Sequence, residues 1–218
     1  MQAIRFQPFQ CLAAGALVLL LSGCNLPKPP ESVVRYDLGA APALTVPSTS
    51  LSPIAVAQMQ APLQMEGNTG LHYRLAYADA QVLHTYGQAR WSLPPAQMVQ
   101  QRLREHLGQG GRVVLSADPG EVPPAVQGRQ VPVLRLALEE FSHFFASAQD
   151  SVGWVRIRAT LVDPAVQGDV LLAQKVFDVR QPSAAANASG GVQALAQALD
   201  TVGAQMREWL VQSMPTPR

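Results

Sequence analysis

The sequence predicts an α+β protein: a two-layer domain in which a mostly antiparallel sheet packs against two amphipathic helices. Apolar residues alternate with other residues in three successive segments, 134–138, 155–161 and 171–179, as expected of strands with one buried face. They recur at helical spacing in two further segments, 96–107 and 192–209. The alternating segments predict the sheet, and the helical segments predict the layer that covers it.

The first 23 residues have the composition of a signal peptide. Met1–Gln10 carries one basic side chain, Arg5, and no acid, and the apolar run Cys11–Leu21 follows it. That run is too short to span a bilayer comfortably, since a spanning helix needs about 20 apolar residues. Residues 1–23 are therefore predicted to be removed, and Cys11 is lost with them.

The residues Leu21, Ser22, Gly23 and Cys24 resemble a bacterial lipobox. A branched apolar residue precedes two small residues that fit a peptidase cleft, and the thiol of Cys24 is the nucleophile that accepts a diacylglyceryl group. Acyl chains of the palmitate type contribute roughly 0.8 kcal/mol for each buried CH₂, and two or more chains anchor a protein stably. The alternative is an ordinary secretory signal with a cysteine near its end.

The rest of the chain divides into a lipid-anchored tether (24–50), the α+β domain (51–213) and a short tail (214–218). Prolines soon after Cys24 make the tether stiff and extended. Within the tether, Val33–Leu38 alternates and is compatible with a first strand. The domain itself has the length of one ordinary folding unit.

The charge balance excludes one class of partner. The chain has 16 basic and 15 acidic residues, so removal of Arg5 with the signal peptide leaves 15 of each and a formal net charge of zero. A neutral domain is a poor match for nucleic acid or for an acidic polymer. Charged residues make up 14% of the chain, against about 25% in an average soluble protein, which is compatible with an exposed interaction face.

The first half of the domain predicts three strands and one helix. Ile54 begins a short apolar strand, and Leu71–Leu75 and Val82–Gln88 follow as partner strands. Ser92 is the expected N-cap of the first helix, because two prolines suited to a first helical turn come directly after Leu93.

The second half predicts an antiparallel meander and a long helix. Arg112–Ser116 is a short strand, and 118–130 is rich in proline and glycine and is expected to be an exposed loop. The alternating pattern of the next strand changes phase at Glu139-Glu140, where a bulge is expected.

Residues of the types that carry catalysis are present but scattered. None of the four histidines is paired with another ligand type at zinc-site spacing: His72, His84, His106 and His143. In a regular strand Glu139 and Glu140 point to opposite faces, and we expect them at a solvated strand end, with His143 at the surface. The sequence thus predicts no catalytic residue, no metal site and no cofactor.

Several blocks occur in a recognisable order. The most specific runs from Tyr86 to Met98 (Tyr-Gly-Gln-Ala-Arg-Trp-Ser-Leu-Pro-Pro-Ala-Gln-Met). The others are Tyr36–Leu38, Leu71–Leu75, Leu136–Phe141, Arg158–Asp163, Leu172–Phe177 and Gly191–Leu195, with Trp209 near the end. This ordered set resembles the ABC-type transport auxiliary lipoproteins, the small outer-membrane partners of MCE-type lipid transport systems. The likeness covers Cys24 to Trp209 and departs at Ala76–Thr85, which is richer in alanine.

The resemblance implies a protein that is not an enzyme. In such systems the ATPase, permease and MCE protein carry out transport, and the lipoprotein links their assembly to the outer membrane from the periplasm. Asn25, rather than Asp, follows Cys24, which in lipoproteins of double-membrane bacteria implies sorting to the outer membrane. The expected partners are an MCE-domain protein, the ABC transporter components and, through the lipid, the membrane; a homo-oligomer is also compatible with the sequence.

Two other functions stay open. A periplasmic enzyme would assemble its site from residues such as His84, Glu139 and His143, and a pocket with convergent titratable side chains would favour it. An adaptor for cell-wall synthesis or secretion would have the same anchor and fold class. Neighbouring genes for an ATPase, a permease and an MCE protein would separate the transport function from the adaptor.

Tyr86, Arg90 and Trp91 are the predicted partner interface, either as a contact surface or as the corner that supports one. Trp and Arg are the residue types most enriched in interface hot spots. The alternative for Trp91 is that its ring packs into the core and holds the first helix against the sheet.

Overall fold

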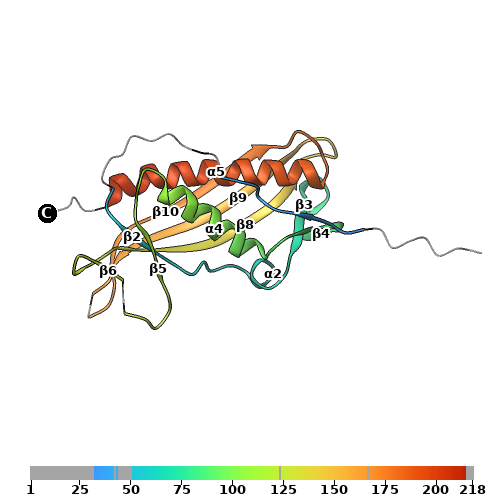
Figure 1. The fold of residues 1–218 in the computed structure, drawn as a ribbon. Helices are drawn as coiled ribbons and strands as arrows, with labels where there is room; N and C mark the ends of the chain where they lie inside the picture. Colours follow the sequence, from blue (N-terminus) through green and yellow to red (C-terminus); the bar gives the residue numbers. More distant parts are fainter. Residues whose placement is uncertain (1–31, 42, 44–50, 123, 166, 215–218) are drawn as a thin grey trace, which may run out of the picture. The chain divides into compact units, whose positions relative to one another are not determined.

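The computed structural model describes residues 32–41, 43, 51–122, 124–165 and 167–214, and its fold belongs to the compact unit that starts at Val33. The three longest strands follow one another as neighbours in the sheet (Figure 1): β8 (Val133–Phe145), β9 (Ser151–Asp163) and β10 (Val170–Pro182), with β10 at an edge. Both pairings are antiparallel, which confirms the predicted meander. The β8–β9 register shifts between Leu138 and Glu140, so the predicted bulge is also present.

Shorter strands make the sheet mixed. They are β1 (Val34–Tyr36), β2 (Ile54–Ala57), β3 (Gly70–Leu75), β4 (Ala80–Trp91) and β5 (Val114–Ala117). β2 and β3 pair in parallel with the beginning and the end of β8, and β5 pairs in parallel with β2. β4 is antiparallel to β3, and β1 lies parallel to β4. The longest ladders remain antiparallel, and β1 brings part of the predicted tether into the fold.

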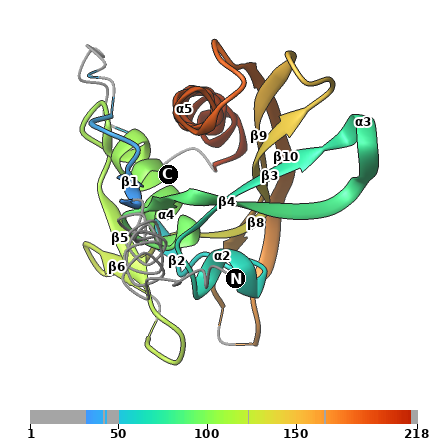
Figure 2. The same cartoon turned by 90° about the vertical axis from the view of Figure 1, so that its right-hand side faces the viewer.

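The second layer consists of α4 (Pro95–Gly108) and α5 (Ala188–Ser213). Figure 2 shows both on the same side of the meander, and α5 packs against β9, β10 and α4. The predicted apolar stripes are buried in both helices: Ala96, Val99, Leu103 and Leu107 in α4, and Val192, Leu195, Leu199, Val202, Met206 and Trp209 in α5. In the described part of the chain no helix is long and apolar enough to cross a membrane.

Small elements complete the fold. They are the one-turn helices α2 (Leu63–Glu66) and α3 (Ala76–Asp79), and the hairpin strands β6 (Ala125–Val126) and β7 (Arg129–Gln130). The hairpin lies inside the segment predicted as a loop. It is too short for an alternating pattern to reveal it.

The start of α4 differs from the sequence expectation, and the structure also shows how α5 is capped. The N-cap of α4 is Pro94, without a side-chain hydrogen bond, and the Ser92 hydroxyl donates to the sulfur of Met98 instead. The predicted Ser92 cap is therefore wrong, because the extended chain through Pro94 carries Ser92 past the helix end. The cap of α5 is Asn187, whose side chain accepts from Gly190 N at 2.9 Å.

Close packing of α5 on the sheet depends on Gly153 in β9. A Cβ at this position would lie 2.8 Å from the carbonyl oxygen of Ala194 and closer still to the Leu195 nitrogen. The helix backbone therefore rests directly on the strand, and a larger residue would push the two layers apart. This contact places the N-terminal half of α5 over β8 and β9.

Candidate functional site

The predicted corner lies at the end of β4. The Trp91 side chain is 0% exposed, its ring centroid is 5.5 Å from that of Phe141, and its amide donates to Thr69 O at 2.7 Å. Arg90 folds back on its own strand and donates to the carbonyls of Tyr86 and Ala89. Of the two alternatives for Trp91, the structure has the ring in the core. The tryptophan therefore supports the corner, and only its neighbours reach the surface.

A buried histidine lies beside this corner. His143 Nδ1 is 2.9 Å from Tyr86 Oη, and His143 Nε2 is 2.8 Å from Ser151 Oγ. The imidazole is 0% exposed, so the expectation of a surface histidine is wrong. The bulge after Leu138 is the reason, because one extra residue moves Phe141 and His143 onto the helix-facing side of β8.

The electrostatics of this group argue against nucleophilic catalysis. Burial lowers the pKa of His143 to about 4, and burial together with Tyr73 raises the pKa of Tyr86 above its usual range. The phenol therefore stays protonated, and its hydroxyl can donate to Nδ1 or accept from it in either tautomer of the ring. An imidazole with so low a pKa is a weak base, and both it and Ser151 are buried, which is unsuited to a general base and its nucleophile.

The adjacent carboxylates also differ from expectation. Glu139 accepts from Arg156 at 2.8 Å and from Arg158 at 2.7 Å, while the buried Glu140 pairs with Arg74 at 3.0 Å. Burial raises the pKa of Glu139, but the two arginine hydrogen bonds outweigh it and hold the pKa below its usual range. The prediction of a solvated strand end is therefore wrong for Glu140. This side chain is covered because β3 runs beside this end of β8.

The three residues of the enzyme alternative do not gather around a cavity. His84 stacks on Tyr73, with ring centroids 5.0 Å apart, whereas Glu139 and His143 have the partners given above. Two adjoining pockets share Gln58, Gln60 and Pro119, and one of them is also lined by α4. None of the three residues lines either pocket. Among the described residues, no group of three or more His, Cys, Asp or Glu side chains is arranged to hold a metal ion.

Polar and aromatic side chains cover the face of the meander opposite to α5. We call this the outward face and define it by Glu139, Trp154, Arg156, Arg158, Asp178 and Arg180. Trp154 Nε1 donates to Asp178 at 2.8 Å, and Arg156 donates to the same carboxylate at 3.1 Å. The Arg180 guanidinium lies 4.2 Å from the Trp154 ring centroid. These side chains are partly exposed and hold one another in place, which suits a surface that binds a protein.

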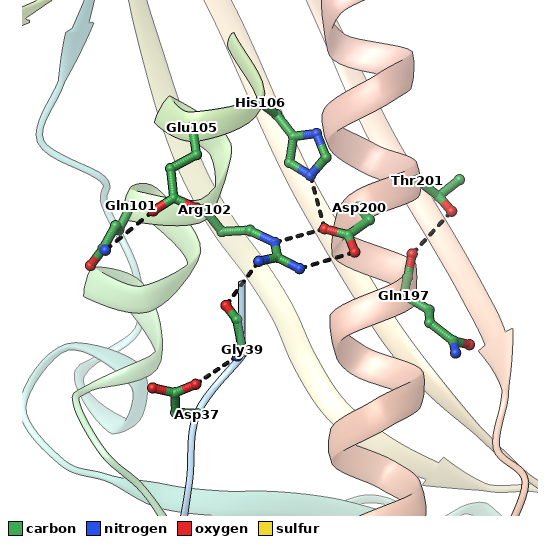
Figure 3. A network of polar contacts seen from close by, with 9 residues as sticks. All are labelled: Asp37, Gly39, Gln101, Arg102, Glu105, His106, Gln197, Asp200 and Thr201. Atoms are coloured by element: carbon green, nitrogen blue, oxygen red, sulfur yellow. Dashed lines mark hydrogen bonds and ion pairs between the residues drawn. The ribbon is translucent and has the colours of Figure 1, made fainter. Parts of the chain in front are cut away.

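A polar clip joins the two helices to the segment after β1 (Figure 3). The Arg102 guanidinium donates to both carboxylate oxygens of Asp200, at 2.7 and 3.1 Å, and its third nitrogen donates to Gly39 O at 3.0 Å. His106 Nε2 is 2.8 Å from the same carboxylate. One acid on α5 thus binds two residues of α4, and through Arg102 the clip also holds the chain that leads out of the sheet.

The side chains of this clip are largely buried, which strengthens the interaction between their charges. Arg102 and His106 are almost fully buried, and the Asp200 side chain is 21% exposed. Burial raises the pKa of Asp200, but hydrogen bonds from His106 and Arg102 outweigh it and keep the carboxylate ionised. The clip therefore holds the segment that follows β1 against the two helices.

Comparison with known proteins identifies the chain. The family model described as "ABC-type transport auxiliary lipoprotein component" matches residues 36–207. The chain belongs to this family. No curated protein matches it significantly. Among solved structures, a Xanthomonas campestris protein of family DUF330 superposes with a TM-score of 0.62 at 18% identity, covering 84% of this chain and 94% of the other. An uncharacterised protein gives a TM-score of 0.59 at 16% identity, covering 83% and 99%.

Membership of the auxiliary lipoprotein family confirms the resemblance drawn from the ordered blocks. The block Tyr86–Met98 spans the end of β4 and the start of α4, so it encodes the corner built around Trp91. Cys24 and its lipobox lie outside the described residues, and lipid attachment there remains a prediction.

The sequence analysis missed the residues that join elements across the fold. Arg102 and His106 lie between the apolar positions of the helix predicted over 96–107, and both are buried. Their spacing of four residues puts them on one helix face, and Asp200 adjoins the apolar stripe of the last helix. The four-residue spacing and the position of Asp200 can each be seen within one helix. The contact between Arg102 and Asp200 cannot, because it joins residues on two different helices.

Proposed function

We propose that this auxiliary lipoprotein is a non-enzymatic accessory of an MCE-type lipid transport system, anchored in the outer membrane by lipid on Cys24 and facing the periplasm. The family match carries the proposal, since it covers nearly the whole folded unit and concerns a transport auxiliary lipoprotein. In this function the ATPase, the permease and the MCE protein move the lipid, and the lipoprotein holds their periplasmic part to the membrane.

The chemistry of the folded unit supports a binding function. The contact between Ser151 and His143 is buried, and burial lowers the pKa of His143 to about 4, which makes the imidazole a weak base. We propose that the outward face receives the MCE-domain partner, because arginine and tryptophan side chains held by a network keep little conformational freedom to lose on binding. The corner at Tyr86 and Arg90 is a second predicted contact.

The anchor is tested by acyl labelling in cells. Wild-type protein should incorporate an acyl-chain probe and fractionate with the outer membrane, whereas Cys24→Ser should do neither. Equal labelling of both proteins, or wild-type protein in the soluble periplasm, would contradict the anchor. Neighbouring genes for cell-wall synthesis or secretion, in place of the transporter genes, would favour the adaptor alternative.

The partner surface is tested by co-purification with the MCE protein. Arg156→Ala and Arg158→Ala should each weaken capture several-fold, while unfolding changes by no more than about 1 kcal/mol, as expected for exposed ion pairs. Arg104→Ala is the matched control, because this partly exposed arginine lies on α4 and donates to Leu115 of β5, away from both the outward face and the corner at Arg90. Equal capture by all three variants would remove the outward face from the proposal.

Catalysis is tested separately with His84→Gln, which changes a partly exposed residue of the enzyme alternative. The variant should complement a deletion strain as well as the wild type. Loss of complementation at normal abundance would return an enzymatic role to consideration.

A further inference from the structure

A groove opens where two neighbouring strands separate. The parallel pairing of β2 with β5 ends at Ala57 and Ala117. The chain after β2 continues beside β8, since Gln60 N donates to Leu136 O at 2.9 Å, whereas the chain after β5 turns away from it (Figure 1). The two adjoining pockets described above occupy the space between these segments, and each has a volume of about 330 Å³. We call the two pockets together the groove.

The groove has an apolar floor and a polar rim. The floor consists of buried side chains from four different elements or segments: Met59, Ala96, Val133 and Leu136. Glutamine and carboxylate side chains make up most of the rim, and most of them are exposed. An apolar centre with a polar rim is the usual arrangement of a surface that binds a protein.

The rim is acidic. It carries the carboxylates of Glu66, Asp118, Glu121 and Asp169, and its basic side chain, Arg135, pairs with Asp169. Within the described part of the chain, the other three carboxylates form no ion pair with a basic side chain. The chain after the predicted signal peptide has a formal net charge of zero, so this excess of negative charge is local. Because a groove focuses the field of the charges that line it, this groove favours a positively charged ligand.

The distribution of the acids favours a long cationic ligand over a compact one. Glu66 lies on α2, Asp118 and Glu121 follow β5, and Asp169 precedes β10. Lysine and arginine side chains suit both parts of the groove, because their apolar stems pack on apolar surface while their charged heads stay at a polar rim. A peptide that enters between separating strands is extended, as in other cases of strand addition to a sheet.

We propose that the groove binds an extended polypeptide segment of a partner protein that carries two or three lysine or arginine side chains. Their stems pack on the floor at Met59 and Leu136, and their charged heads meet Asp118 and Glu121. The groove shares no lining residue with the outward face. Binding here is therefore independent of the surface proposed for the MCE-domain partner.

The probe is a fluorescently labelled peptide in which three lysines alternate with valine or alanine, and its anisotropy is followed as the full chain is added in nonionic detergent. The wild type should bind it saturably at low ionic strength, and salt at about 0.3 M should weaken binding several-fold. The double variant Asp118→Asn, Glu121→Gln should bind about tenfold more weakly, because two rim charges are lost. Both residues are exposed, so the fold should tolerate the changes.

Two controls separate this groove from general attraction to acids. Glu105→Gln removes an exposed acid of α4 outside the groove and should keep wild-type binding. Gln97→Trp changes no charge, but its indole should fill the groove and abolish binding. Gln101→Trp is its matched control, since this exposed residue lies one turn further along α4 and does not line the groove.

Three results would overturn the proposal. The first is equal binding of the lysine peptide by the wild type and the double variant. The second is equal binding of a peptide with glutamate in place of lysine. The third is displacement of the labelled peptide by spermine, a cation without a peptide backbone, at the same concentration as by unlabelled peptide. We expect spermine to need a concentration at least about tenfold higher, because it does not bind as an extended peptide.

Discussion

Replacement of Trp91 by alanine tests whether the corner of the fold is held by core packing. The indole is 0% exposed and belongs to the main core cluster with Phe141. A buried Trp covers about 200 Å², which at about 25 cal/mol per Å² corresponds to roughly 5 kcal/mol as an upper bound. Measured Trp-to-Ala changes in cores cost about 3–5 kcal/mol, and we expect Trp91→Ala to fall in that range.

The assay is urea unfolding followed by far-ultraviolet circular dichroism, which does not depend on the lost indole. For a domain of this size, each kcal/mol lowers the melting temperature by about 2–4 °C, so a fall of roughly 6–20 °C should accompany the loss. Trp154→Ala is the matched control. Its ring lies on the outward face against Arg180 and donates to Asp178, and its loss should cost about 1–2 kcal/mol.

Three outcomes would refute this reasoning. A loss below about 1 kcal/mol for Trp91→Ala would mean that the ring is not a core residue. Unchanged unfolding together with lost capture of the MCE partner would mean that Trp91 is a direct contact. A similar loss for both tryptophans would show that burial does not separate their roles.

Three further predictions concern the clip, the buried histidine and the helix–sheet contact. Asp200→Asn should cost about 2–4 kcal/mol in urea unfolding, because Arg102 stays buried without its carboxylate; an effect below 1 kcal/mol would contradict a structural clip. His143 has a pKa of about 4 in the fold and about 6.5 when unfolded, so the unfolded state binds more protons between these values. The free energy of unfolding should therefore fall by up to about 1.4 kcal/mol per pH unit as the pH drops from 6.5 to 4. His143→Gln should flatten this pH dependence. The same pH dependence in the variant and the wild type would contradict the prediction. Gly153→Ala should cost about 3 kcal/mol or more, because its Cβ meets the backbone of α5; wild-type stability would show that the two layers separate easily.

The meander and the two long helices were predictable because their signal is local. Leu134, Leu136 and Leu138 are buried along one side of β8, and Leu195 and Leu199 lie on the buried stripe of α5. Such periodicity reports which side of an element faces the core. It does not report the neighbour that covers that side, so the parallel pairing of β2 and β3 with β8 came only from the structure.

The bulge in β8 shows what the pattern within one strand predicts and what it does not. The phase change at Glu139-Glu140 is visible in the sequence, and the structure confirms it. Its consequence is that His143 turns under α5 and that Glu140 meets Arg74. Both depend on which elements lie above and beside the strand, which a single strand's pattern does not contain.

By itself, the sequence determined the fold class, the order of the main elements and the family, since each follows from patterns within short segments. Only the tertiary structure decided that Trp91 is buried and that Arg102 meets Asp200 across 98 positions of sequence. The physical reason is that the energy of a polar or aromatic side chain depends on its burial and its partners. Both are set by chain segments that are distant in sequence and become neighbours only when the layers pack.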